Sequence, residues 1–138
     1  IRRSRMKQGT ETITPAEDTI LMVDTTGELS SLYMCSDIVI VGRSFEPNFG
    51  GQNMIEPAAM GKPVIVGPHT ENFVPVMKYF NENNAMLVLS NASMIEETLR
   101  ELIVSSKKRE EFGSKAKAVV DAQRGTLTRS AIEIIANM

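Results

Sequence analysis

The fold is decided by Gly50-Gly51-Gln52-Asn53-Met54-Ile55-Glu56-Pro57-Ala58-Ala59. One apolar run, from Ile38 to Gly42, precedes this stretch, and a second, from Pro63 to Gly67, follows it. Short apolar runs bounded by glycine and proline are typical of strands that are buried on both faces. The order is therefore strand, glycine-containing loop, short helix and strand, which predicts a parallel α/β sheet.

Two interpretations of the glycine loop are open. Adjacent glycines allow close approach to a ligand, and the start of the following helix offers free N–H groups to a phosphate. In such sheets, ligands bind outside the carboxyl ends of the strands. Alternatively, Asn53 and Glu56 form a capping pair and the glycines only turn the chain. The stretch contains neither a complete GxGxxG motif nor a Walker loop, so the residues alone favour neither interpretation.

The composition excludes several classes of protein. The chain has 138 residues, a net charge of −2 and no tryptophan, which fits one soluble domain that does not bind nucleic acid. Its one cysteine, Cys35, cannot form an internal disulfide and is expected to be a buried thiol. With His69 as the one histidine, no metal site and no cofactor are expected. No signal peptide is expected, and no apolar segment in these residues is long enough to span a membrane.

Four short apolar runs are predicted as strands, at 20–23, 38–42, 63–66 and 85–89. Helices are expected after Thr25 or Thr26, which would cap the first one, and at 53–59, 74–83, 91–104, 107–122 and 126–137. This alternation predicts a parallel sheet of at least four strands with helices on both sides. The basic residues of segment 1–19 fit either a solvated chain end or an anion-binding segment.

Candidate site residues also follow the other strands. Thr26, Gly27 and Glu28 lie just after the run 20–23, where they form either a rim of a ligand site or only a helix cap. Ser44 follows the run 38–42 and offers a hydroxyl. His69 is either a ligand contact or an exposed loop residue. No GxSxG, HExxH or CxxC motif is present, so the domain is better equipped to bind a ligand than to transform one.

The chain resembles the Kdo transferases of lipopolysaccharide synthesis, which move 3-deoxy-D-manno-octulosonic acid (Kdo) from CMP-Kdo to lipid A precursor. The resemblance rests on five motifs in order, at residues 24–33 (DTTGELSSLY), 37–42 (DIVIVG), 50–59 (GGQNMIEPAA), 63–69 (PVIVGPH) and 72–73 (NF). It implies a Rossmann-like sheet flanked by helices, forming the C-terminal, donor-binding domain (residues 1–138) of a GT-B glycosyltransferase whose N-terminal domain is absent from this chain.

The resemblance also implies roles for particular residues. Glu56 would bind the ribose hydroxyls. Gly50, Gly51 and Asn53 would surround the phosphate and sugar, with Ser44 lining the same pocket and Thr26, Gly27 and Glu28 nearby. Gln52 stands where many members have histidine, so an acid–base role at this position is in doubt. No metal is expected.

The partners and location follow from the same resemblance. They are CMP-Kdo, the N-terminal domain of the same protein and, through that domain, lipid A precursor. The full-length protein is expected at the cytoplasmic face of the inner membrane, and this fragment is expected to be soluble and inactive alone, because the catalytic carboxylate lies in the missing domain. Two alternatives are open: the nucleotide-sugar-binding domain of another GT-B glycosyltransferase or epimerase, and a non-catalytic flavodoxin-like interaction module.

Overall fold

The computed structural model describes residues 1–6 and 19–136, with side chains up to residue 124. Its centre is a parallel sheet in the order β1-β2-β3. The register pairs Val39 with Val64 and Ile65 with Leu87. The elements in chain order are η1 (Arg3–Arg5), α1 (Leu29–Cys35), β1 (Val39–Val41), η2 (Gly42–Phe45), α2 (Ile55–Ala59), β2 (Val64–Val66), η3 (Glu71–Phe73), α3 (Val74–Glu82), β3 (Leu87–Val88), η4 (Ala92–Met94), α4 (Ile95–Val104) and α5 (Ser106–Ala136).

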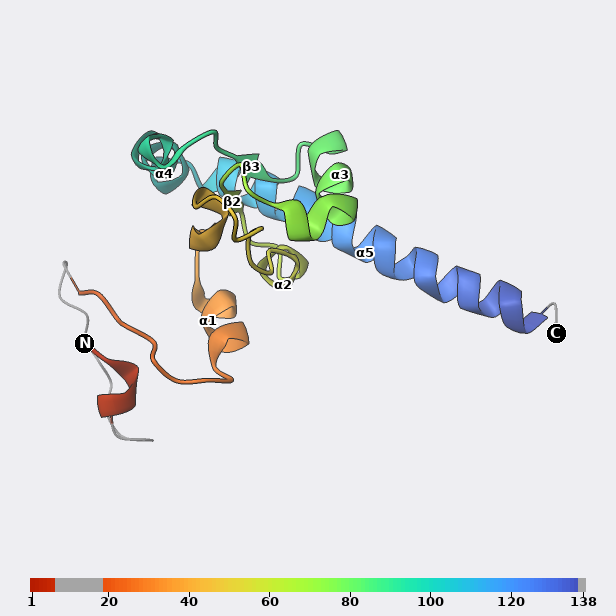
Figure 1. Cartoon of the computed structure of the whole chain (residues 1–138), viewed down its shortest axis with the longest axis horizontal. Helices are drawn as coiled ribbons and strands as arrows, with labels where there is room; N and C mark the ends of the chain where they lie inside the picture. The colour runs from red at the N-terminus through yellow and green to blue at the C-terminus, as the bar shows by residue number, and fades with distance from the viewer. Residues whose placement is uncertain (7–18, 137–138) are drawn as a thin grey trace.

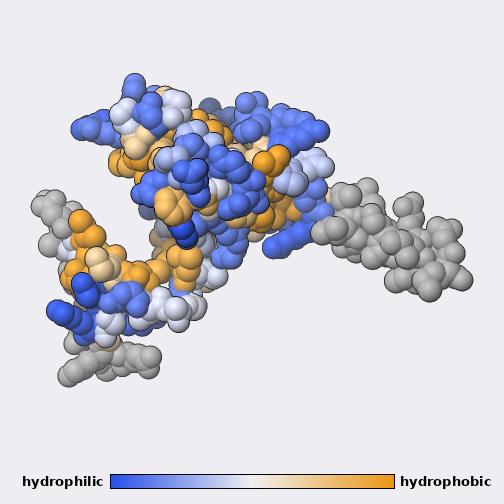
Figure 2. Space-filling model, viewed as in Figure 1, coloured by the Kyte–Doolittle hydropathy of each residue, from blue (hydrophilic) through white to orange (hydrophobic). Residues whose placement is uncertain are grey.

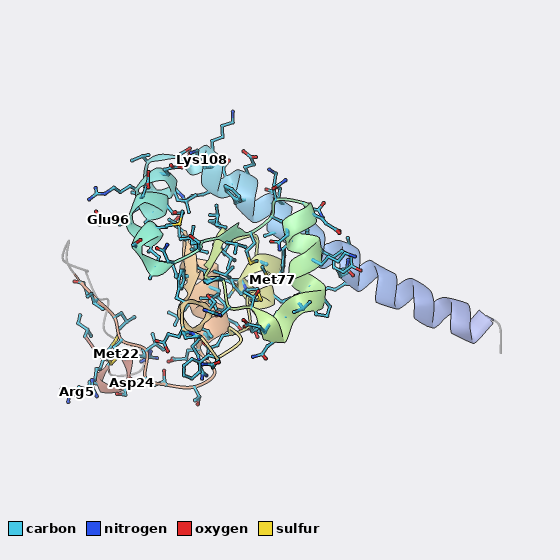
Figure 3. All side chains as sticks on the ribbon, turned by 45° about the horizontal axis from the view of Figure 1, so that its top comes forward. Arg5, Met22, Asp24, Met77, Glu96 and Lys108 are labelled. Atoms are coloured by element: carbon cyan, nitrogen blue, oxygen red, sulfur yellow. The ribbon has the colours of Figure 1, made fainter. Side chains whose placement is uncertain are left out.

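Helices cover both faces of the sheet, as the alternating pattern predicts (Figure 1). Successive strand side chains point to opposite faces, so Val64 and Val66 lie in one apolar cluster and Ile65 in another. The first cluster contains buried residues from α2, α3 and α5, including Met77 of α3, which is labelled in Figure 3. The second is built around Leu102 of α4. The central strand β2 is therefore buried on both faces, as predicted.

Two helices end where the sequence places a residue that tolerates the left-handed conformation. After α2, Gly61 has a φ of 70°, and its N–H donates to the carbonyl of Ala58. After α3, Asn84 has a φ of 48°, and its N–H donates to the carbonyl of Asn81. In each case the N–H of the next residue donates to the carbonyl five residues earlier in the chain, which completes a Schellman motif. These terminations return the chain to the sheet for β2 and β3.

The run 20–23 is not a sheet strand, so the prediction of at least four strands is wrong for the described residues, where the sheet has three. The backbone of Met22 is already paired with the N-terminal segment: its N–H donates to Ile1, and its carbonyl accepts from Arg3. This leaves one isolated parallel bridge between Arg2 and Met22. The segment lies apart from the sheet in Figure 1, and apolar atoms show on its surface in Figure 2.

Three further predictions are wrong. Neither Thr25 nor Thr26 caps α1, whose N-terminal flanking residue is Glu28 and carries no capping side-chain bond. Cys35 is exposed, because no residue of α1 is buried. The two predicted helices beyond residue 106 are one continuous helix, α5.

The first part of α5 packs on the core, and its later part extends away from the other elements (Figure 1). The spacing of Phe112, Ala116 and Val119 predicts one inner face of this helix; Ala116 and Val119 are buried, and Phe112 is partly buried. The second predicted face, with Leu127, Ile132 and Ile135, lies outside the described side chains. The packing of α5 on the turn after α2 is very close: a Cβ on Gly113 would lie 2.0 Å from the carbonyl oxygen of Gly61.

Candidate donor-binding site

The carboxyl ends of β1 and β2 are joined through a buried serine. The Ser44 hydroxyl donates to the carbonyl of Val41 and accepts from the N–H of Gly67 at 2.7 Å. The backbone carbonyl of Ser44 also accepts from the N–H of His69 at 3.0 Å. Ser44 is 0% exposed. Its hydroxyl is therefore already engaged in holding together the loops that follow two neighbouring strands, and this gives the residue a structural role beside the predicted pocket.

The glycine loop rests on this pair of strand ends. Gly50 and Gly51 are buried and have φ values of 64° and 80°, a region that non-glycine residues rarely adopt. A Cβ on Gly51 would lie 3.1 Å from the carbonyl oxygen of His69, and a Cβ on Gly50 would collide with the side chain of Asn72. Protein atoms, rather than open space, thus lie where a side chain on either glycine would be. The glycines are needed first for packing one loop on another.

The start of α2 carries the predicted pair Asn53 and Glu56. Asn53 Oδ1 accepts from the N–H of Ile55 at 2.9 Å, and Asn53 Nδ2 donates to Glu56 Oε1 at 2.8 Å. The residue that flanks α2 is Met54, which makes no capping side-chain bond. The two bonds of Asn53 therefore resemble the capping pair that the sequence left as an alternative, but they begin one residue earlier. Asn53, Glu56 and the neighbouring Gln52 are all exposed, so capping leaves them accessible to a ligand.

Tyr33 of α1 lies close enough to Glu56 to interact with it electrostatically. Burial raises the pKa of the Tyr33 hydroxyl, and the negative charge of Glu56 raises that pKa further. Helical spacing places Tyr33 on one face of its helix with Leu29 and Leu32. Its position beside Glu56 depends on the packing of α1 against α2, which local sequence does not reveal.

The predicted residues Thr26 and Glu28 lie at a different place, around a cavity of about 690 Å³. The other lining residues are Arg3, Ser4, Met6, Asp24 and Thr25. No residue of the range 44–56 lines this cavity. The structure therefore separates the predicted site into a loop region at the strand ends and a polar cavity beside the N-terminal segment. Gly27, in the same turn, has a φ of 85°.

Carboxylates hold the N-terminal segment at this cavity. Asp24 accepts from the N–H of Ser4 at 2.8 Å and from its hydroxyl at 2.7 Å, and these bonds lower the pKa of Asp24. Glu28 accepts from Thr25 and forms an ion pair with Arg3 at 2.7 Å; the Thr25 bond, then Arg3, lowers the pKa of Glu28. Arg5, Met22 and Asp24 gather at this end of the molecule in Figure 3.

The basic side chains near the glycine loop have protein partners in this structure. The Arg43 guanidinium lies 4.7 Å from the ring centroid of Phe49. His69 Nδ1 lies 3.2 Å from Glu71 Oε1. The His69 side chain is 31% exposed, so it is neither buried nor fully exposed, and this exposure does not decide between the two predicted alternatives. The pKa of Glu71 is lowered, first by a bond to its own backbone N–H and then by His69.

Two further observations concern the described part of the chain. No group of three or more His, Cys, Asp or Glu side chains within it is arranged to hold a metal ion. No helix within it combines the length and apolar character needed to cross a membrane.

The chain is similar in sequence to 3-deoxy-D-manno-octulosonic acid transferases. It is 38% identical over 117 residues to that of Haemophilus influenzae, across 83% of this chain and 27% of that protein. It is 36% identical over 111 residues to that of Bordetella pertussis, across 80% of this chain and 26% of that protein. A probable mitochondrial member from Arabidopsis thaliana is 35% identical over 91 residues, across 66% of this chain and 20% of that protein.

A solved structure supports the same relationship. The C-terminal CMP-Kdo binding domain of WaaA from Acinetobacter baumannii has a TM-score of 0.67 and 28% sequence identity, covering 72% of this chain and 52% of that one. No protein-family model matches. The chain spans 27% and 26% of the first two curated relatives, about a quarter of their length. By sequence and by fold, the chain belongs with the 3-deoxy-D-manno-octulosonic acid transferases and corresponds to part of such a protein.

Proposed function

We propose that this chain binds the CMP-Kdo donor in a glycosyltransferase that moves Kdo onto lipid A precursor. One observation carries the proposal: the glycine loop and the start of α2 lie at the carboxyl ends of β1 and β2, in a fold similar to a CMP-Kdo binding domain. Glu56 binds the two ribose hydroxyls, since a carboxylate accepts two bonds and a vicinal diol supplies two donors. Gly50, Gly51 and Asn53 surround the phosphate and sugar.

The remaining predicted residues have supporting roles. Ser44 holds the two strand ends together through its buried hydroxyl. Gln52 is exposed and offers a donor that does not titrate near neutral pH. Thr26 and Glu28 line the separate polar cavity, with Gly27 in the same turn, so the proposed contacts to the donor are those of residues 50–56. Donor binding uses no metal and no cofactor.

The rest of the GT-B enzyme completes the reaction. Its N-terminal domain binds lipid A precursor, supplies the catalytic carboxylate and attaches the protein to the cytoplasmic face of the inner membrane. The present chain alone therefore transfers no Kdo from CMP-Kdo to the acceptor, as a radiolabel assay would measure. Turnover above background in a preparation free of the full-length enzyme would contradict the assignment of acceptor binding and catalysis to the N-terminal domain.

Titration of the ¹⁵N-labelled chain with cytidine and uridine nucleotides tests donor binding directly. CMP should shift the amide signals of residues 50–56 at millimolar concentrations, which corresponds to about −4 kcal/mol of binding free energy. UMP should shift them less. A well-dispersed spectrum that CMP leaves unchanged would refute the proposal, and a stronger response to UDP would favour another nucleotide-sugar enzyme.

A further inference from the structure

The side chain of Asn72 occupies the space beside Gly50 where any other residue would carry its Cβ. A Cβ built on Gly50 would lie 2.4 Å from Nδ2, 2.5 Å from Cγ and 2.7 Å from Oδ1 of Asn72. All three distances are far below van der Waals contact, so Gly50 and the Asn72 carboxamide are sterically matched. The φ of 64° at Gly50 requires glycine there for a second, independent reason.

Asn72 also holds the loop by two hydrogen bonds to consecutive residues. Its Nδ2 donates to the carbonyl of Phe49 at 3.2 Å, and its backbone N–H donates to the carbonyl of Gly50 at 3.2 Å. Both acceptors belong to the backbone that leads into Gly51. Asn72 lies in η3, after β2, so the bonds connect the two loops at the carboxyl ends of neighbouring strands.

The contact continues on the other side of the glycine pair. A Cβ on Gly51 would lie 3.1 Å from the carbonyl oxygen of His69, whose N–H in turn donates to Ser44. The backbone at Gly51 is therefore limited by the ordered turn that Ser44 anchors. At Gly50, by contrast, the restraint includes an exposed side chain that can be removed without disturbing the core.

We propose that Asn72 is a positioning residue for donor binding: it fixes the left-handed conformation of Gly50, and so of the loop that receives the nucleotide. The proposal rests on the proposed function. Consecutive glycines have more conformational freedom than any other residue pair, and a loop that is ordered before binding loses less entropy when the ligand arrives. Asn72 supplies that order without touching the donor.

The first test compares Asn72→Ala with Asn83→Ala. Asn83 is a matched control, because its Nδ2 also donates to a backbone carbonyl, that of Tyr79, at an exposed position remote from the glycine loop. In the unliganded protein, Asn72→Ala should increase about tenfold the hydrogen-exchange rate of the amide at position 72, whose N–H donates to the carbonyl of Gly50. It should weaken CMP binding about tenfold, equivalent to about 1.4 kcal/mol, and change the melting temperature no more than the control does.

The second test uses the steric match. Gly50→Ala should weaken CMP binding strongly, because the new methyl group meets the Asn72 carboxamide and the backbone resists a positive φ. Adding Asn72→Gly removes the collision but not the backbone strain. The double variant should therefore bind CMP better than Gly50→Ala alone, although each single change is harmful. If the reduction in CMP affinity of the double variant equals the product of the reductions in the two single variants, the steric match is contradicted.

The outcomes separate this inference from the proposed function. Unchanged exchange of the amide at position 72 in Asn72→Ala would overturn the inference, whatever CMP does. Increased exchange with unaltered CMP affinity would also overturn it, because loop order would then be irrelevant to the ligand. If the wild-type chain binds no CMP, the proposed function fails and the positioning role fails with it. In that case the exchange data still decide whether Asn72 orders the loop.

Discussion

Replacing Glu56 with alanine distinguishes a ribose anchor from a helix cap. The carboxylate is exposed, and one of its oxygens accepts from Asn53 at 2.8 Å. Hydrogen bonds to charged groups contribute about 1.5–3 kcal/mol, so loss of the ribose contacts should weaken CMP binding by about ten- to a hundredfold. Loss of the capping contact should cost at most about 1 kcal/mol of folding free energy, because Asn53 still caps Ile55 without Glu56.

Glu56→Gln refines the comparison, since it keeps an acceptor for Asn53 but removes the charge. Neutral hydrogen bonds are about half as strong as charged ones, so its CMP affinity should lie between those of wild type and Glu56→Ala. Glu97→Ala, an exposed change on α4, serves as the control. CMP affinity by NMR titration and melting temperature should be measured on the same samples. A lowered melting temperature with affinity within about twofold of wild type would refute the ribose role and leave only the cap.

Three further predictions follow from other parts of the structure. Gly113→Ala should lower the melting temperature by several degrees, because its Cβ would lie 2.0 Å from the carbonyl oxygen of Gly61. Overpacking of this kind costs about 1–3 kcal/mol, whereas the gain in helix propensity is about 1 kcal/mol. Ser114→Ala, the exposed neighbour, should not lower it, and a rise for both would show that α5 does not pack this closely. The pKa values of Asp24 and Glu28 are lowered from their ordinary values of 3.8 and 4.5. The bonds of these carboxylates to the N-terminal segment therefore stabilise the protein above those ordinary values and are lost only as the pH falls through the lower folded values. NMR signals of the segment that change well above pH 4.5 would contradict this. Cys35 should react completely with a thiol reagent without denaturant, whereas protection until unfolding would show a buried thiol.

Local sequence predicts the central part of the fold because the signals there are local. The apolar run at 64–66 is buried on both faces, and Gly61 and Asn84 terminate helices through their own backbone conformations. The capping pair of Asn53 and Glu56 is also local, since its members lie three residues apart. Such features can be predicted from neighbouring residues alone, without knowing which elements pack against them.

The errors arise where a distant partner decides the outcome. The run 20–23 has the composition of a strand, but its backbone pairs with Ile1 and Arg3. Helical spacing places Leu29, Leu32 and Tyr33 on one face of α1, yet no residue of that helix is buried. Two helices were predicted at 107–122 and 126–137, but α5 is continuous across the gap between them, where one interior glycine, Gly125, costs only about 1 kcal/mol.

The candidate site shows the same division. Its residues at 50–56 are recognisable from glycine, capping and motif signals. The steric match between Gly50 and Asn72 is not, because it joins residues that are far apart in sequence through a single side-chain placement. Ser44 was predicted to offer a hydroxyl to the site, and the structure shows that this hydroxyl is already engaged.

The close approach of Gly61 and Gly113 brings the backbone of α5 directly against the turn that ends α2. The helix has 31 residues and is therefore about 46 Å long. Near its beginning, it is pressed against the turn that ends α2, with no side chain between the two backbones to absorb a displacement. The same short helix, α2, carries Glu56 in its first turn. The long helix α5 and the residue proposed to bind the ribose are therefore separated only by one backbone contact and one short helix.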